Sequence, residues 1–162
     1  MKNPGFHSKS FKEGIEILID EIELAVRWQR PSILLAIHQT KAEQPKAQRA
    51  LGKSIQLLGH KVAAIKASPL SPDAITAMCK TPGHEQIVFF VSGLGRASEP
   101  SNRRIFSALN MKRERLVEFS IRAVFWLTEA EAAEMPHYSP DFWAFRHRVV
   151  EFAPSRKKTN SS

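Results

Sequence analysis

Three glycine-containing or basic segments have residue types that bind phosphate in other proteins. The tripeptide Gly52-Lys53-Ser54 matches the end of a Walker A motif, but Ala47 stands where that motif requires its first glycine. The tripeptide also lies eight or more residues beyond the end of the preceding expected strand, inside an amphipathic helical pattern. A phosphate loop must follow its strand directly, so that its backbone N–H groups point inward. We therefore predict that Lys53 faces solvent and does not bind phosphate.

The second segment contains Gly93 and Gly95, which follow the apolar run 87–91 as glycines of a dinucleotide-binding loop do. The third glycine of that motif is replaced by Ser98. No Asp or Glu follows Val91, so the carboxylate that holds magnesium in ATP-hydrolysing domains is missing as well. These departures predict that the chain does not hydrolyse nucleoside triphosphates.

The histidines and the cysteine show no spacing typical of a metal centre or a nucleophile. No two of the six histidines are four residues apart, as a helical zinc site requires. Only His38 stands at the carboxyl end of a central expected strand, where α/β folds bind ligands, and the favoured interpretation is an ordinary polar residue leaving the core. Cys79 is interpreted as a small buried residue. We predict no catalytic residue, no metal and no cofactor.

The third segment, 96–122, has seven Lys or Arg against three Glu. At about 100° per residue, the buried side of a helix over 101–119 is predicted to consist of Ile105, Leu109, Leu116 and Phe119. Asn110 is predicted to project away from this side, and Arg113 to lie at its margin. An arginine at such a margin covers apolar surface with its stem or pairs with a carboxylate, and a phosphate contact is the less favoured alternative.

Apolar patterns that alternate between the strand and helix periods must position these segments. Strands are predicted near 32–38, 62–66, 86–92, 122–127 and 148–152. Helices are predicted over 11–28, 45–58 and 101–119, with a short one from about 73 and another that Thr128 caps and that Pro136 and Pro140 interrupt. Strand–helix–strand order makes parallel crossovers. The fold class is therefore a three-layer α/β sandwich with a mainly parallel sheet of about five strands, P-loop-NTPase-like or Rossmann-like without a Walker A loop.

The length and charge of the chain limit the possible domain organisation and the classes of partner. The 162 residues suit one domain, predicted over 11–152, with a flexible N-terminus over 1–10 and a disordered basic tail over 153–162. The net charge of +8 favours nucleic acid or an acidic partner, but five of these charges belong to the two ends, which leaves +3 for the domain. No apolar run approaches the roughly 20 residues of a membrane span, and one cysteine fits a reducing compartment. We predict a cytoplasmic protein that does not contact membranes.

Four segments of the second half occur in the same order and spacing in a family of bacterial domains. They are 109–116 (LNMKRERL), 123–127 (AVFWL), 140–146 (PDFWAFR) and 150–152 (VEF). The chain thereby resembles degenerate P-loop-type α/β modules of STAND and tetratricopeptide-repeat signalling proteins. The resemblance covers about residues 30–152, and only the part from Ile87 onward is specific to this family. The resemblance implies a non-enzymatic adaptor in a bacterial sensory or defence assembly. Its implied partner is a protein, either such a signalling protein or a second copy of the chain.

The shared motif is interpreted first as a structural contact. Asp141 is expected to cap a short helix ahead of two large aromatics, and Trp126 and Trp143 to close one end of the sheet together. Arg113 and Arg146 are expected to pair with carboxylates. The alternative is a ligand- or partner-binding site made by Asn110, Arg113, Asp141, Trp143 and Arg146. Two further functions stay open, a nucleic-acid-associated basic protein and a nucleotide-binding domain without hydrolysis.

Overall fold

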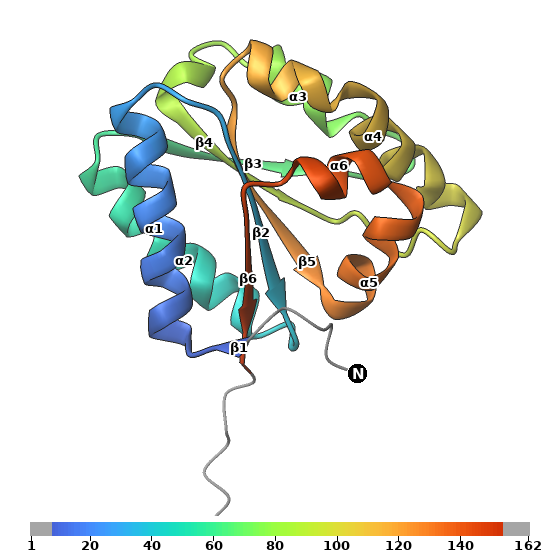
Figure 1. Ribbon diagram of the computed structural model, residues 1–162, viewed down its shortest axis with the longest axis horizontal. Coiled ribbons are helices and arrows are strands. Elements are labelled where there is room, and N and C mark those ends of the chain that lie inside the picture. Colours follow the sequence, from blue (N-terminus) through green and yellow to red (C-terminus); the bar gives the residue numbers. More distant parts are fainter. Residues whose placement is uncertain (1–7, 154–162) are drawn as a thin grey trace, which may run out of the picture.

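A parallel sheet forms the middle layer of the protein, and helices cover both of its faces (Figure 1). The computed structural model describes residues 8–153. Across the sheet the strands follow the order β1-β6-β2-β5-β4-β3, and every neighbouring pair is parallel. The strands are β1 Ser8–Lys9, β2 Ser32–His38, β3 Lys61–Lys66, β4 Ile87–Ser92, β5 Arg122–Thr128 and β6 Arg148–Phe152.

The five predicted strands are confirmed, each within one residue of its predicted bounds. The two-residue β1 is too short to show a period, and it extends the sheet beyond the prediction by pairing with β6. The domain therefore begins before the predicted boundary at residue 11, and Lys9 belongs to the sheet rather than to a flexible terminus. The predicted tail lies outside the described residues except for Ala153, whose N–H donates to the carbonyl oxygen of Lys9 at 2.7 Å.

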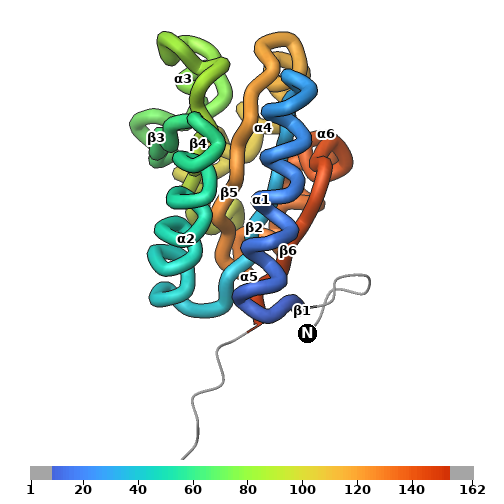
Figure 2. The backbone as a smooth tube through the Cα atoms, turned by 90° about the vertical axis from the view of Figure 1, so that its left-hand side faces the viewer, coloured from blue at the N-terminus to red at the C-terminus, as the bar shows by residue number. Residues whose placement is uncertain are grey.

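Within residues 8–153, two helices cover one face of the sheet and four cover the other. Helices α1 Phe11–Arg27 and α2 Glu43–Leu57 lie side by side on the first face (Figure 2). The second face carries α3 Ala74–Cys79, α4 Arg103–Glu118, α5 Glu129–Tyr138 and α6 Pro140–Phe145 (Figure 1). Two single-turn 3-10 helices, η1 His84–Gln86 and η2 Pro100–Asn102, precede β4 and α4.

The prolines between β5 and β6 act differently from each other. Pro140 is the first residue of α6, a position where its missing N–H has no helical partner to lose. Pro136 lies inside α5, which continues to Tyr138. The predicted break at Pro136 is therefore wrong, while the one at Pro140 is confirmed.

Alternate residues of each strand supply two hydrophobic cores, one on each face of the sheet. On β2, Leu34 and Ala36 face α1 and α2, whereas Ile33, Leu35 and Ile37 face the other four helices. Because both faces are covered, β2 is buried along its whole length, which explains its continuous apolar sequence.

The two tryptophans of the shared motif belong to different cores. Trp126 is buried with α1 and α2, where its ring meets Phe90 edge-on at 5.4 Å between centroids. Trp143 is half-buried and packs against the opposite core. The prediction that both close the same end of the sheet is wrong, because they lie on opposite faces.

Three of the four residues predicted for the buried side of α4 are buried. The fourth, Phe119, is 42% exposed, because α4 ends before it and the chain turns at Ser120, where φ is 50°. Phe106 is fully buried on this helix instead.

Because all the strands are parallel, the sheet has two chemically different ends. The carboxyl end, which lies at the bottom of Figure 1 for β2, β5 and β6, includes the segments that follow β2, β4 and β5. The amino end lies opposite and includes the turns that lead into the strands.

Candidate functional site

The predicted site residues lie in and next to one contact between α4 and α6. Oδ1 of Asn110 accepts hydrogen bonds from the N–H groups of Asp141 at 2.8 Å and Phe142 at 3.2 Å. Nδ2 of Asn110 donates to Oδ2 of Asp141 at 3.3 Å. These N–H groups belong to the first turn of α6 and have no partner within their own helix. Asn110 therefore caps α6 from a different helix.

Two predictions about this contact are wrong. Ser139, not Asp141, occupies the N-cap position of α6, and its hydroxyl donates to the carbonyl oxygen of Phe106 at 2.5 Å. Asn110 does not project into solvent, since α6 packs over that side of α4. The helical period places a residue on its own helix, but it does not reveal a second helix that covers the polar side.

The two arginines of the predicted site make different contacts. NH1 of Arg113 donates to the carbonyl oxygen of Asn110 at 2.6 Å and lies 3.9 Å from Oδ2 of Asp141, which confirms the expected pairing with a carboxylate. The guanidinium carbon of Arg146 lies 4.2 Å from the ring centroid of Trp143, and NH1 of Arg146 donates to the Trp143 carbonyl. Desolvation lowers the pKa of Arg146. Asn110 and Arg113 on α4 thus contact Asp141 on α6, while Trp143 and Arg146 contact each other at the end of α6.

The loop between β2 and α2 lies where a Walker A loop would lie, between a central strand and the next helix. The N–H of Gln39 donates to Oε2 of Glu43 at 3.1 Å, and Glu43 is the first residue of α2. The Glu43 carboxylate therefore lies at the positive end of the helix dipole, the kind of place at which phosphate binds. His38 is 5% exposed, and its Nδ1 lies 3.1 Å from the carbonyl oxygen of Thr40.

The loop after β4 is bound by a carboxylate from α5. Oε2 of Glu131 accepts from the N–H of Gly95 at 2.6 Å, and its Oε1 accepts from the N–H of Thr128 at 2.8 Å. The Thr128 hydroxyl in turn accepts from the N–H of Glu131 at 3.1 Å, which confirms the predicted cap. Gly95 has a φ of 73°, and a Cβ there would lie 2.6 Å from Nδ2 of Asn102, so this position requires glycine.

Glu134 binds the same loop one helical turn later. Its Oε2 accepts from the N–H of Ser98 at 2.6 Å, and its Oε1 pairs with Nε of Arg96. Burial opposes ionisation of Glu134, but the bonds from Arg96 and Ser98 outweigh it and lower the pKa of this carboxyl. The carboxyl end of the sheet is therefore closed by the chain's own acidic side chains.

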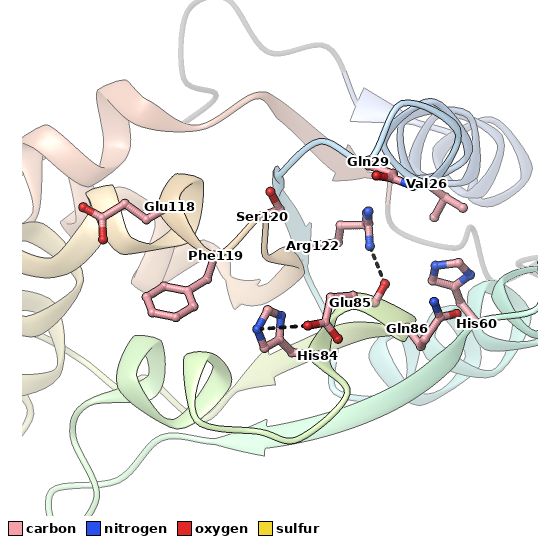
Figure 3. Close-up of a pocket in the computed structure, with 10 residues that line it drawn as sticks. All are labelled: Val26, Gln29, His60, His84, Glu85, Gln86, Glu118, Phe119, Ser120 and Arg122. Carbon is pink, nitrogen blue, oxygen red and sulfur yellow. Dashed lines mark hydrogen bonds and ion pairs between the residues drawn. The ribbon is translucent and has the colours of Figure 1, made fainter.

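A cavity of about 570 Å³ lies at the amino end of the sheet (Figure 3). Arg122, the first residue of β5, is 4% exposed on its wall, and NH1 donates to the carbonyl oxygen of Glu85 at 2.8 Å. Nε of Arg122 has no hydrogen-bond partner, and neither has the buried Nδ1 of His60 or of His84. Desolvation lowers the pKa of Arg122. Glu118 also lines this cavity, so it contains charges of both signs.

None of these cavity residues is among the predicted site residues. They come from the end of α4, the first residue of β5 and the segments before β3 and β4, so no spacing in the sequence connects them. The one local signal is Arg122 itself, a charged residue at the start of an otherwise apolar strand. Whether such a residue is buried depends on what packs around the start of the strand. The strand's own sequence pattern does not reveal that packing.

The remaining motif residues have ordinary structural positions. Lys53 lies within α2 and is exposed, as predicted, and it borders a groove between α2 and β3. Cys79 is half-buried beside α4, and burial raises the pKa of its thiol. Within residues 8–153, no three His, Cys, Asp or Glu side chains gather closely enough to hold a metal ion. In the same part of the chain, no helix is both long and apolar enough to cross a membrane.

The strand order around β2 decides the fold class. If the five long strands are numbered 1 to 5 along the chain, their order in the sheet is 2-3-4-1-5, all parallel. The chain has an AAA+-like P-loop fold. It is similar to the ORC1 protein of Aeropyrum pernix, solved in complex with DNA, with a TM-score of 0.54 and 14% sequence identity. The predicted fold class is confirmed.

The similarity to ORC1 covers 88% of this chain and 45% of the ORC1 chain. The chain therefore spans less than half the length of that protein, and at this identity the likeness shows the fold alone. The chain matches no protein-family model and no curated protein. What the AAA+-like domain does must therefore be argued from its own residues.

Proposed function

We propose that this AAA+-like domain is a non-enzymatic adaptor, which uses the P-loop-type fold as a scaffold for protein–protein contacts in a bacterial sensory or defence assembly. One observation carries the proposal: the chain's own carboxylates bind backbone N–H groups in the loop at the Walker A position and in the loop that contains Gly93 and Gly95. Glu43 accepts from Gln39, and Glu131 accepts from Gly95. A nucleotide phosphate would have to displace these carboxylates and would meet their like charge.

Two features of the sequence agree with this proposal. Ala47 replaces the first Walker A glycine, and no carboxylate follows Val91 to hold magnesium. The resemblance of 109–152 to modules of STAND and tetratricopeptide-repeat proteins supports an adaptor role over an enzymatic one. The proposed location is the cytoplasm, since one free cysteine fits a reducing compartment.

Thermal unfolding with and without nucleotide tests the non-enzymatic part of the proposal. A ligand at about 100 times its Kd stabilises a protein by about 2.7 kcal/mol, which gives a clear rise in the melting midpoint. We expect ADP, ATP and GTP, each with magnesium, to leave the midpoint unchanged. A rise with any of them would overturn the proposal in favour of a nucleotide-binding domain, and phosphate release that Lys53→Ala abolishes would make it an enzyme.

Affinity capture from a cytoplasmic extract of the source organism tests the adaptor part. The extract is treated with nuclease first, so that partners bridged by nucleic acid are removed. We expect a protein to be recovered in stoichiometric amount with the AAA+-like domain. Recovery of nucleic acid without any stoichiometric protein would contradict the adaptor function.

Nucleic-acid association is the second candidate, and the distribution of charge favours it. Residues 41–66 have six Lys or Arg, and Glu43 is their only acidic residue. ORC1, whose fold is similar, was solved in complex with DNA. Gel retardation of duplex and single-stranded DNA over a range of salt distinguishes the two functions. Binding through phosphate contacts weakens steeply as salt rises, and an adaptor is expected to show no retardation at physiological salt.

A further inference from the structure

A groove of about 580 Å³ lies between α2 and β3. β3 is the edge strand opposite β1, and α2 packs beside it (Figure 2). Val62, Ala64 and Phe90 line the groove from the sheet, and Arg49 and Lys53 are among the residues that line it from α2. The floor is therefore apolar, and its two charged residues, Arg49 and Lys53, are basic and exposed. No acidic residue lines the groove.

β3 leaves one side of its backbone without a strand partner, because within residues 8–153 it pairs only with β4. The N–H of Ala67, just after β3, donates to the carbonyl oxygen of Ser92 on β4. Backbone groups in a strand alternate in direction with a period of two, so those of Ala63 and Ile65 also face β4. The N–H and C=O groups of Val62 and Ala64 therefore point away from the sheet, and the side chains of the same two residues line the groove.

We propose that this groove binds an extended acidic segment of a partner protein, which adds to β3 as a further strand of the sheet. The inference rests on the proposed adaptor function and names the class of partner. Main-chain hydrogen bonds to Val62 and Ala64 would supply affinity, and the side chains that face α2 would supply specificity. Binding by strand addition uses the free side of β3 as it stands, without any change in the fold.

The spacing of the two basic residues defines the sequence of the partner segment. Arg49 and Lys53 are four residues apart on α2, which separates them by about 6 Å along the helix axis. In an extended strand, residues i and i+2 point to the same face and are about 6.6 Å apart. Two acidic residues at i and i+2 of the bound segment therefore match Arg49 and Lys53. The expected ligand has Asp or Glu at alternate positions.

Charge on β3 itself favours the same occupant. Lys61 and Lys66 are exposed at the two ends of the strand, and their charge repels a basic segment and attracts an acidic one. The chain's own segment 156–158 (RKK) has the same sign of charge as the groove. The acidic residues of α1 are in a helix, which cannot add to a strand. The occupant is thus a segment of another protein.

Fluorescence anisotropy with a labelled octapeptide of alternating glutamate and valine tests the proposal. We expect saturable binding to the wild-type chain and none of a matched peptide with lysine in place of glutamate. The double variant Arg49→Gln, Lys53→Gln is expected to weaken binding at least tenfold. The control Arg104→Gln, Arg115→Gln removes the same charge from exposed positions of α4 on the opposite face and is expected to bind like the wild type.

Strand addition is tested separately from charge. Ala64→Pro removes an outward N–H without removing a bond to β4, and it is expected to weaken binding at least tenfold at an unchanged melting midpoint. If this variant unfolds, the wild-type chain is titrated with a peptide methylated at alternate backbone nitrogens, which is expected to bind at least tenfold more weakly. Equal binding of the methylated peptide, or of a folded Ala64→Pro variant, would overturn strand addition.

The same peptide and variants test whether the groove binds a nucleic acid or a second copy of the chain instead. Tighter binding of an oligonucleotide that competes with the peptide and depends on Arg49 and Lys53 would make the groove a nucleic-acid interface and overturn the proposal. So would dimerisation of the wild-type chain in size-exclusion chromatography that the double variant abolishes, because the occupant would then be a second copy. Suppose that the peptide fails to bind, while a protein partner is still captured from the nuclease-treated extract. The groove proposal then fails and the adaptor function stands. If nucleotide raises the melting midpoint, the adaptor function fails independently of the peptide result.

Discussion

The two ends of the sheet hold charged side chains in opposite ways. At the carboxyl end, Glu131 and Glu134 each accept two hydrogen bonds, whereas Glu43 accepts one from a backbone N–H and its buried Oε1 has no partner. At the amino end, the buried Arg122 donates to the carbonyl of Glu85, and its Nε has no partner. A buried charge destabilises a fold unless hydrogen bonds compensate it. The carboxyl end is therefore expected to stabilise the domain and the amino end to weaken it.

This difference bears on where a ligand can act. Parallel α/β folds usually bind ligands at the carboxyl end of the sheet. In this chain that end is closed by its own carboxylates, whereas the cavity and the uncompensated cation lie at the amino end (Figure 3). Substitutions at each end of the sheet test this difference.

Glu131→Ala is expected to lower the free energy of unfolding by about 2–4 kcal/mol. It removes one arm of a capping box, for which about 0.5–2 kcal/mol is typical, and it leaves the N–H of Gly95 without its acceptor, for which about 1–3 kcal/mol is typical. Urea denaturation measures the loss. Glu129→Ala, at an exposed position of the same helical turn, is the control and is expected to change stability by less than about 0.5 kcal/mol. Equal losses in the two variants would contradict the importance assigned to the carboxyl end.

The Glu131 contacts also show which features the sequence predicts and which it does not. Thr128 and Glu131 are three residues apart, so the cap between them was predictable from local spacing. Gly95 is 36 residues from Glu131, and no local pattern connects the two. The long strands were predictable because continuous apolar runs require burial on both faces. The same reasoning misses β1, where two residues show no pattern.

Long-range polar contacts limit the prediction of the candidate site in the same way. Asn110 was assigned to the solvent side of α4 because the helical period describes one helix at a time. Its acceptor role depends on α6, which is 31 residues away in sequence at Asp141. The residues of the α4–α6 contact were identified from the sequence, but the direction of each hydrogen bond was not.

Asn110→Ala is expected to lower the free energy of unfolding by about 1–2 kcal/mol. This loss lies between those expected for the substitutions at the two ends of the sheet. The substitution leaves two N–H groups of the first turn of α6 without their acceptor. Differential scanning calorimetry measures the change, with Ser107→Ala at an exposed position of α4 as the control. If Asn110→Ala keeps the wild-type midpoint and loses a captured partner, the α4–α6 residues form a partner-binding surface instead of a structural contact.

The stability of the domain is expected to depend on pH, because acid removes the charge from carboxylates. Hydrogen bonds lower the pKa of Glu134, although burial opposes them. Burial also opposes ionisation of Asp73, but hydrogen bonds from Lys112 and Thr76 outweigh it and lower the pKa of that carboxyl. Groups with a lowered pKa contribute stability above their ordinary value, about 4, and this contribution disappears as pH falls through the lowered pKa. Stability is therefore expected to fall below about pH 4.

Urea midpoints between neutral pH and about pH 3 measure this loss. The variants Glu134→Gln and Asp73→Asn are expected to be less stable than the wild type at neutral pH and to lose less stability on acidification. Parallel pH profiles for the variants and the wild type would mean that other carboxylates cause the acid sensitivity.

Arg122→Met is expected to have the smallest effect, a change within about 1 kcal/mol or a gain in stability. Methionine has a similar length and fills the same space without the desolvation that a guanidinium suffers, and replacing an uncompensated buried charge by an apolar side chain is often neutral or stabilising. The carbonyl of Glu85 loses one donor, which limits the gain. Arg122→Ala removes the apolar stem as well and is expected to lose about 1–3 kcal/mol, so the difference between the two variants separates packing from charge. A loss above about 2 kcal/mol for the methionine variant would mean that the hydrogen bond to Glu85 outweighs the desolvation of the guanidinium. In that case the amino end would stabilise the domain as the carboxyl end does, and the contrast between the two ends of the sheet would disappear.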